Sequence, residues 1–256
     1  MIFPLTPPGP AAPLFGDWQE TMIWSCLSGV MGAVYGDDPE APAAALAVLG
    51  DFCFFAGEPC RELVRYPRER LGPRRRILVP QNEDWAALIE ECWGTVAERE
   101  ERYAIKKEPD VFDRAKLERA AASLPAGYRI QPMDRELFRR CRQNRWSEDF
   151  TAQYRDWEQF SRYGLGMMVM EGDKLVSGAS SYSGWPGGIE VEIDTHPDYR
   201  RRGFAYAAAA ALILACLSRG WYPSWDAQNS ASAALAEKLG YHFSHRYTVY
   251  YDAGEG

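Results

Sequence analysis

The most constraining feature of the sequence is an alternating stretch that leads through a basic turn into an alanine-rich run. Ile189–Thr195 alternates aliphatic with acidic side chains, so an extended strand places the two kinds on opposite faces. Pro197 then turns the chain, three arginines follow, and Gly203 precedes a run rich in alanine and leucine that extends to Arg219. A strand followed by a long apolar helix requires a sheet against which the helix can pack, which predicts an α/β fold.

The turn between this strand and this helix has the properties of an anion-binding site. The start of a helix presents unpaired N–H groups and a partial positive charge. Gly203 lets a ligand approach the backbone closely, Ala205 keeps the first turn small, and Arg200–Arg202 add positive charge. A pyrophosphate suits such a turn, whereas a solvated arginine run before a core helix is the alternative that spacing alone leaves open.

Three motifs in the second half of the chain resemble those of a known superfamily. Arg200–Ala205 has the form R-x-x-G-x-A, Trp225–Asn229 is a predicted strand end with an asparagine, and Leu235–Tyr241 ends in Lys-x-Gly-Tyr. Over residues 126–251 this combination resembles the GNAT superfamily of acyl-CoA-dependent N-acetyltransferases. The resemblance implies an α/β (α+β) fold with a mixed, mostly antiparallel sheet flanked by helices, and acetyl-CoA as the acyl donor.

Nearly the full length of the chain also resembles one subfamily, the zwittermicin A resistance-type acetyltransferases. That likeness rests on five short segments: Tyr35–Asp38, Gly50–Phe54, Arg102–Lys107, Glu192–Thr195 and Trp225–Ala227. Because these segments lie in both halves, the subfamily resemblance extends beyond the motifs that the superfamily shares.

The resemblance implies a cofactor site residue by residue. Backbone groups of Ile193 and Thr195 would pair with the pantetheine arm like an added strand. Asn229 would contact this arm where the strands Ile189–Thr195 and Trp221–Ala227 splay apart. The pyrophosphate would be held in the basic turn, by Arg200, Arg201, Arg202, Gly203, Phe204 and Ala205. No metal site is expected, because no cysteine and histidine cluster has zinc spacing.

The family's chemistry is the direct attack of a neutral primary amine on the thioester carbonyl. A backbone N–H such as that of Ile193 would stabilise the oxyanion. Glu192 and Glu190 are the candidate catalytic bases because they lie opposite the aliphatic face of their strand; the alternative is that they only attract a cationic substrate or face solvent. Many GNAT enzymes carry a tyrosine, the general acid, where this chain has Ala236, so no general acid is assigned.

The sequence therefore predicts an N-acetyltransferase that acts on a small-molecule amine. The missing tyrosine leaves open an acetyl-CoA-binding sensor or pseudoenzyme. A protein or peptide N-acetyltransferase is a further alternative; it needs an open groove, whereas a long N-terminal half favours a walled pocket. Monomer and homodimer are both compatible with the sequence.

Composition excludes several other classes of function. The formal net charge of −7 argues against a nucleic-acid partner, whose phosphates require a basic surface. The longest apolar run, Tyr206–Leu217, is too short to span a bilayer, and the prolines near the start are unlike a signal peptide. The six cysteines lie mostly inside apolar patterns and none forms a C-x-x-C pair. We expect a cytoplasmic protein without membrane partners.

An approximate repeat suggests two related halves. Gln81-Asn82 with Ala86–Leu88 and Glu90 recurs, at a constant offset, as Gln228-Asn229 with Ala233–Leu235 and Glu237. We divide the chain into an N-terminal α/β half, residues 1–125, and a GNAT acetyltransferase domain, residues 126–256. Under this interpretation the first half is a degenerate copy that has lost the glycine-containing turn; chance similarity between two amphipathic helices explains the repeat equally well.

Three local predictions depend on pattern alone. Glu148–Ser161 is expected to form one helix. Ser183–Gly188 is expected to form a loop, on which Trp185 is the best candidate for lining an acceptor pocket. Trp221–Ala227 is expected to form one strand.

Overall fold

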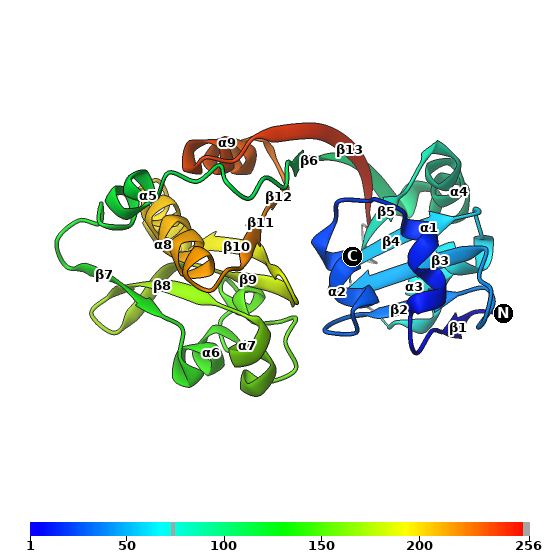
Figure 1. Ribbon diagram of the computed structural model, residues 1–256, viewed down its shortest axis with the longest axis horizontal. Coiled ribbons are helices and arrows are strands. Elements are labelled where there is room, and N and C mark those ends of the chain that lie inside the picture. Colours follow the sequence, from blue (N-terminus) through cyan, green and yellow to red (C-terminus); the bar gives the residue numbers. More distant parts are fainter. Residues whose placement is uncertain (73–74, 253–256) are drawn as a thin grey trace. The chain divides into compact units, whose positions relative to one another are not determined.

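The computed structural model describes residues 1–72 and 75–252, which form two compact units (Figure 1). The N-terminal unit comprises residues 1–102 with 246–252, and the C-terminal unit comprises residues 103–245. The division falls within two strands, β6 (Ala97–Ile105) and β13 (Phe243–Asp252). Residues 103–125 thus belong to the C-terminal unit, whereas the sequence pattern predicts a boundary at residue 125.

A mostly antiparallel sheet forms the centre of the N-terminal unit. Five of its strands run in the order β1 (Phe3–Pro4), β2 (Ala33–Gly36), β3 (Ala44–Leu49), β4 (Phe52–Gly57) and β5 (Ile77–Pro80), and only β4 and β5 among these are parallel. Strand β13 continues the sheet by pairing antiparallel with β5. The helical elements are η1 (Gly9–Ala11), α1 (Ala12–Phe15), α2 (Thr21–Leu27), α3 (Arg61–Arg70), α4 (Glu83–Trp93) and η2 (Gly94–Val96). Because β3 and β4 are almost entirely apolar, both are buried, and their side chains pack with Trp85 and Ile89 of α4.

The C-terminal unit contains a second sheet, in the order β11 (Tyr222–Ser224), β10 (Gly188–Thr195), β9 (Lys174–Trp185), β8 (Gly166–Glu171) and β7 (Tyr128–Pro132). All neighbours are antiparallel except β10 and β11. Its helical elements are α5 (Arg114–Ala121), α6 (Arg135–Cys141), η3 (Glu148–Phe150), α7 (Trp157–Tyr163), η4 (Pro197–Tyr199), α8 (Phe204–Ser218) and α9 (Ser230–Leu239). The short strand β12 (Asp226–Ala227) pairs with β6 instead. The predicted mixed sheet flanked by helices is confirmed.

The alanine-rich helix α8 is the centre of the C-terminal core. It packs against α5 and against β8, β9 and β10, as Figure 1 shows for the elements around it. Ala207–Ala210 are buried, because small side chains let the helix backbone approach the sheet closely. The core cluster includes Ile189, with Val191 and Ile193 packed against it, so the aliphatic face of β10 points to this core.

The repeated asparagines have the same structural role in both units. Asn82 caps α4 by accepting the N–H of Trp85 at 3.1 Å, and Asn229 caps α9 by accepting the N–H of Ser232 at 3.0 Å. Each asparagine follows the strand that precedes its helix. Asp113 likewise caps α5, as its position in the sequence predicts, through the N–H of Lys116.

The prediction of one helix over Glu148–Ser161 is wrong. Glu148–Phe150 forms only the 3-10 turn η3, and α7 begins at Trp157 after a new cap, in which Asp156 accepts the N–H of Gln159 at 2.8 Å. Between them, the guanidinium of Arg142 donates to the carbonyl oxygens of Thr151 and Tyr154. These carbonyls therefore bond to a distant side chain rather than continuing a helical ladder.

The prediction of a loop over Ser183–Gly188 is also wrong. Strand β9 continues to Trp185 and β10 begins at Gly188, so only two residues connect them. Glycine stands at position 184 because a Cβ atom there would lie 2.0 Å from the carbonyl oxygen of Tyr163. Trp185 is a strand residue that is only 9% exposed, not the loop side chain that was expected to line a pocket.

Candidate functional site

The site centres on one edge of β10, where the sheet opens. Strand β9 pairs with β10 along Gly188–Thr195, but among the described residues β11 pairs only with Gly188–Glu190. Strand β11 ends at Ser224, and the chain continues as β12 in another sheet, paired with β6. The predicted single strand over Trp221–Ala227 is therefore two strands in two sheets, and the expected splay lies beside residues 191–195 of β10.

The backbone of β10 presents donors to this open edge. The N–H of His196 donates to the carbonyl of Val176 on the β9 side, at 2.9 Å. Because N–H groups alternate between the two sides of a strand, those of Ile193 and Thr195 point away from β9. The N–H of Thr195 donates to Oδ1 of Asp194 at 2.6 Å, and burial raises the pKa of that carboxyl group above its ordinary value.

The basic turn that follows has an unusual backbone. Arg201 has a φ of +64°, in the left-handed region, and Gly203 has a φ of +83°. For a residue with a Cβ atom this conformation is uncommon and is found mainly where the surroundings enforce it. Gly203 caps α8 without a side chain, so the first N–H groups of the helix have no capping oxygen from that residue. The turn and the open edge of β10 are thus consecutive in the chain.

The arginines shape the turn as well as charging it. Arg200 donates from Nε to the carbonyl of Thr195 at 3.3 Å and lies 4.0 Å from the carboxylate of Asp194. Arg202 donates to the carbonyl of Asp198 at 3.0 Å, and its guanidinium lies 4.9 Å from the centre of the Tyr199 ring. Arg200, Arg201 and Arg202 are exposed, as a site for a soluble anion requires.

The two candidate bases differ in burial. Glu190 and Glu192 lie on the face of β10 opposite its aliphatic side chains, as predicted. Glu190 is only 3% exposed, whereas Glu192 is half-buried. Burial raises the pKa of Tyr222 to about 12, with a further contribution from the nearby Glu190. A buried carboxylate and a partly exposed one therefore lie two residues apart beside the open edge.

Two serines that sequence patterns do not single out align with Glu190. Ser183 of β9 and Ser224 of β11 are its register partners, so the three side chains form a row across three strands. Both serine side chains are fully buried, and neither hydroxyl has a hydrogen-bond partner among the described residues. No local pattern relates positions 183, 190 and 224; only strand register brings them together.

Asn229 and the residues near Ala236 are placed less favourably for chemistry. The side-chain oxygen of Asn229 is used as a helix cap, which leaves its amide nitrogen as the group available to a ligand. Ala236 is buried in the core. The phenol of Tyr241, the nearest following tyrosine, donates to the carbonyl of Pro223 at 2.6 Å inside the core. None of these supplies an evident acid.

The described part of the chain offers neither a metal-binding cluster nor a membrane-spanning helix. No group of three or more His, Cys, Asp or Glu side chains in residues 1–72 and 75–252 could hold a metal ion. Within the same ranges, every helix is too short or too polar to cross a membrane.

Comparison with known proteins adds independent information. The sequence model of the GNAT acetyltransferase family matches residues 12–250. The uncharacterized N-acetyltransferase YdfB of Bacillus subtilis (strain 168) is 27% identical over 246 residues, which cover 90% of each chain. A crystal structure of a GCN5-related N-acetyltransferase-like protein from Streptococcus suis 89/1591 has 46% identity and a TM-score of 0.89, and the match covers 94% of this chain and 96% of that one.

A tandem protein has the same fold. The tandem GNAT protein from the clavulanic acid biosynthesis pathway is only 13% identical, with a TM-score of 0.54, but the match covers 100% of this chain and 99% of that one. At this identity the likeness concerns the fold alone. It extends over both units.

Proposed function

Because the chain belongs to the GNAT acetyltransferase family, we propose that it moves the acetyl group of acetyl-CoA to a primary amine of a small molecule. One observation carries this proposal: the open edge of β10 leads directly into the glycine-capped start of α8. A ligand with an amide-containing arm and a diphosphate matches these two features in order. The arm would pair with a strand edge, and the diphosphate would meet helix N–H groups.

The donor would bind through backbone groups. Its pantetheine amides would pair with Ile193 and Thr195, and its diphosphate would contact the amides from Arg201 to Ala205 and the charge of Arg200. The N–H of Thr195 would then exchange the carboxylate of Asp194 for a ligand oxygen. The side-chain nitrogen of Asn229 would donate to the arm at the splay between β10 and the β11–β12 segment.

The reaction would proceed by direct transfer. The amine nitrogen attacks the thioester carbonyl and forms the C–N bond, the carbonyl oxygen becomes an oxyanion near the N–H of Ile193, and the C–S bond then breaks. Glu192 or Glu190 takes the proton that the amine loses, directly or through water. The thiolate leaves without a dedicated acid, which its ordinary pKa permits near neutral pH.

A glycine variant tests the donor site. Gly203→Glu places a carboxylate at the proposed diphosphate position and removes a left-handed glycine. We expect calorimetry with coenzyme A to give binding for the wild type and none for this variant. Gly220→Glu is the matched control, since Gly220 is an exposed glycine with a φ of +68° just after the other end of α8. If Gly203→Glu bound coenzyme A with wild-type affinity, the basic turn would not be part of the donor site.

Turnover distinguishes the proposed enzyme from its alternatives. Thiol release from acetyl-CoA is measured over a panel of small amines, and acetylation of peptides is followed by mass spectrometry. Release with small amines supports the proposal. Tight coenzyme A binding with no release on any amine would indicate a sensor or pseudoenzyme, which the alanine at position 236 motivates. Modified peptides with unmodified small amines would indicate a peptide N-acetyltransferase.

Several further assignments belong to the same proposal. We propose that the N-terminal unit is a degenerate copy of the acetyltransferase unit; the matching caps of Asn82 and Asn229 and the full-length likeness to a tandem protein support it. Placement in the zwittermicin A resistance-type subfamily is supported by the segments quoted above. We also propose a cytoplasmic protein, monomer or homodimer, without membrane or nucleic-acid partners; the net charge of −7 supports the last of these, the absence of a nucleic-acid partner.

A further inference from the structure

The last residue of β8, just before the β8–β9 turn, is a glutamate whose carboxylate is bound by two phenols from other elements. The hydroxyl of Tyr199 donates to Oε2 of Glu171 at 2.6 Å. The hydroxyl of Tyr128, on β7, donates to Oε1 of the same side chain at 2.8 Å. Tyr199 directly precedes Arg200, so this contact joins the β8–β9 turn to the basic turn in front of α8.

Two cations complete the cluster around Tyr199. Lys174 donates to the Tyr199 hydroxyl at 3.1 Å, and its ammonium lies 4.6 Å from the centre of the ring. Arg202 lies over the same ring and is 3.5 Å from the hydroxyl of Tyr128. The residues on both sides of Arg201, Tyr199 before it and Arg202 after it, are thus connected to Glu171.

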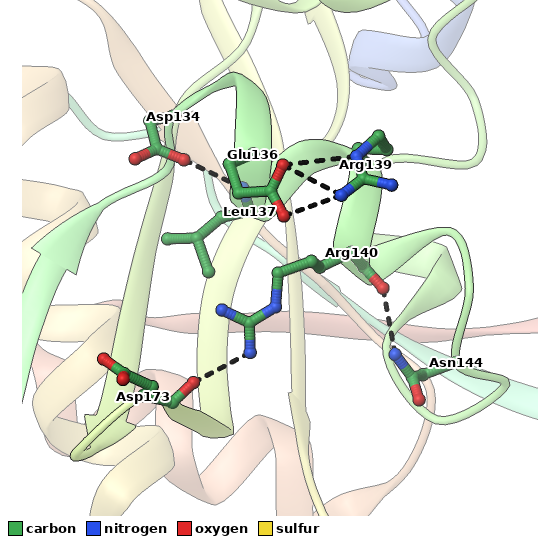
Figure 2. A network of polar contacts seen from close by, with 7 residues as sticks. All are labelled: Asp134, Glu136, Leu137, Arg139, Arg140, Asn144 and Asp173. Carbon is green, nitrogen blue, oxygen red and sulfur yellow. Dashed lines mark hydrogen bonds and ion pairs between the residues drawn. The ribbon is translucent and has the colours of Figure 1, made fainter.

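The β8–β9 turn is itself fixed from two directions. Arg140 of α6 donates to the carbonyl of Asp173 at 2.8 Å, and Figure 2 shows this arginine reaching from its helix to the turn. Figure 2 also shows α6 held at its start, where Asp134 accepts the N–H of Leu137. Arg129 of β7 donates to the carbonyl of Gly172. Glu171 therefore projects from a well-anchored support.

The basic turn needs such a support because its backbone is strained. A left-handed conformation at Arg201 is retained only where the surroundings enforce it. Tyr199 and Arg202 are the neighbours whose side chains leave the turn and bond elsewhere in the unit. Contacts that fix Tyr199 and Arg202 would also fix the backbone conformation of Arg201 between them. They would thereby set the direction of the amide N–H groups that precede α8.

We propose that Glu171 is a positioning residue for the diphosphate-binding turn, acting through Tyr199, Tyr128 and Arg202. This inference rests on the proposed function, since it assumes that the turn binds the diphosphate of coenzyme A. Glu171 does not itself touch the ligand. It keeps Tyr199–Arg202 in the conformation in which the amides from Arg201 onward face one anion.

The charge of Glu171 makes the direction of the change in ligand affinity a test of this proposal. The hydrogen bonds from Tyr199 and Tyr128 hold the pKa of Glu171 below its ordinary value, so the side chain is a carboxylate at neutral pH. A negative charge beside a diphosphate site repels the ligand. If charge repulsion were its only effect, replacing Glu171 with a neutral residue would strengthen the binding of coenzyme A. If Glu171 positions the turn, removing it weakens binding, which is the opposite result.

The experiment measures donor binding and turnover for wild type, Glu171→Gln and Glu171→Ala. We expect Kd for coenzyme A and KM for acetyl-CoA to rise about tenfold in Glu171→Ala, which corresponds to one or two lost charged hydrogen bonds. Glu171→Gln is expected to give a smaller rise, because its amide oxygen still accepts one phenol. We expect kcat at saturating donor to be unchanged, and KM for S-acetylpantetheine, which lacks the diphosphate, to be unchanged as well.

Two further sets of variants keep the test specific. Tyr199→Phe removes one contact but retains the ring, and its effect on Kd should be less than additive with Glu171→Ala, because both changes break the same hydrogen bond. Glu158→Gln is the matched control: Glu158 is an exposed carboxylate of the same unit that pairs with Arg135 at 2.7 Å. It should leave every constant unchanged.

The outcomes separate this inference from the proposed function. Unchanged or tighter coenzyme A binding in both Glu171 variants and in Tyr199→Phe overturns the positioning role. An equal rise in KM for acetyl-CoA and S-acetylpantetheine also overturns it, since that result indicates a general loss of structure. If wild type does not bind coenzyme A, the proposed function fails first, and the role of Glu171 fails with it.

Discussion

The two units of this chain contain helices and strands in the same local order, but the edge of one strand is closed in the N-terminal unit and open in the C-terminal unit. In the N-terminal unit, β4, α3, β5 and α4 form a strand, a crossover helix, a parallel strand and an asparagine-capped helix. In the C-terminal unit, β10, α8, the β11–β12 segment and α9 repeat this order, again with a parallel pair. The comparison isolates what makes one unit a candidate site.

The strand edge is closed in the N-terminal unit. Gln81 accepts the N–H of Gly57, at the end of β4, at 3.0 Å, and it donates to the carbonyl of Leu14 at 2.8 Å. The pairing of β4 with β5 extends to Phe55 and Pro80. In the C-terminal unit the repeat equivalent of Gln81 is Gln228, whose side chain makes no such hydrogen bond within the described residues, and pairing between β10 and β11 ends at Glu190.

Strands β4 and β10 also differ in the polarity of their side chains. Strand β4 is apolar and buried along almost its full length, whereas β10 alternates aliphatic side chains with carboxylates. Helix α3 follows Cys60, and α8 follows the left-handed Gly203. Neither helix start is capped by a side chain, so the two units differ in the strand edge, which is open in β10, and in the left-handed Gly203 that precedes α8.

The largest effect should come from the carboxylates of β10. We expect one of the two variants Glu192→Gln and Glu190→Gln, the one that removes the catalytic base, to lower kcat about 100-fold or more. Coenzyme A affinity should be unchanged in both. Glu91→Gln in α4, an exposed carboxylate paired with Arg61, is the control in the other unit and should leave kcat unchanged. Full activity in both β10 variants, in the thiol-release assay, would leave the chemistry without a base on this strand.

A smaller effect should come from the glutamine that closes the other edge. Gln81→Ala removes two hydrogen bonds, so we expect it to lower the free energy of unfolding by about 1 kcal/mol. Its repeat equivalent, Gln228→Ala, should leave that free energy unchanged, because among the described residues the side chain of Gln228 has no hydrogen-bond partner. Urea unfolding measures both. Equal losses would mean that the two glutamines have the same structural role and that the two strand edges do not differ in this respect.

The smallest expected effect concerns the pH dependence of stability through Asp194. Burial raises the folded-state pKa of its carboxyl group, so folding favours the protonated form. The stability that this protonation contributes is present below the ordinary pKa of an aspartate and is lost as pH rises through the raised value. Asp194→Asn should therefore gain stability relative to wild type over that rise, in thermal unfolding at a series of pH values. A parallel pH profile for the two proteins would contradict the assignment.

Local sequence patterns predicted those parts of the fold that depend only on residues close together in the chain. The alternation of Ile189–Thr195 did predict which side of β10 faces the core, and Asp113 did predict where α5 begins. The helix expected over 148–161 failed because Arg142, outside it, takes the carbonyls of Thr151 and Tyr154. The loop expected at Ser183–Gly188 failed because Gly184 and Gly188 lie in strands, where each allows a close approach of another backbone segment.

By itself, the sequence determined the glycine-containing basic turn, the alanine-rich helix after it and the alternating strand before it, since each depends on neighbouring residues. Only the tertiary structure decided where β11 leaves β10, which serines align with Glu190, and that Glu171 holds Tyr199 and Tyr128. The physical reason is that strand register and hydrogen bonds between distant elements depend on how whole strands pair. A periodic pattern reports which face of a strand is buried, but it does not report which residue lies opposite.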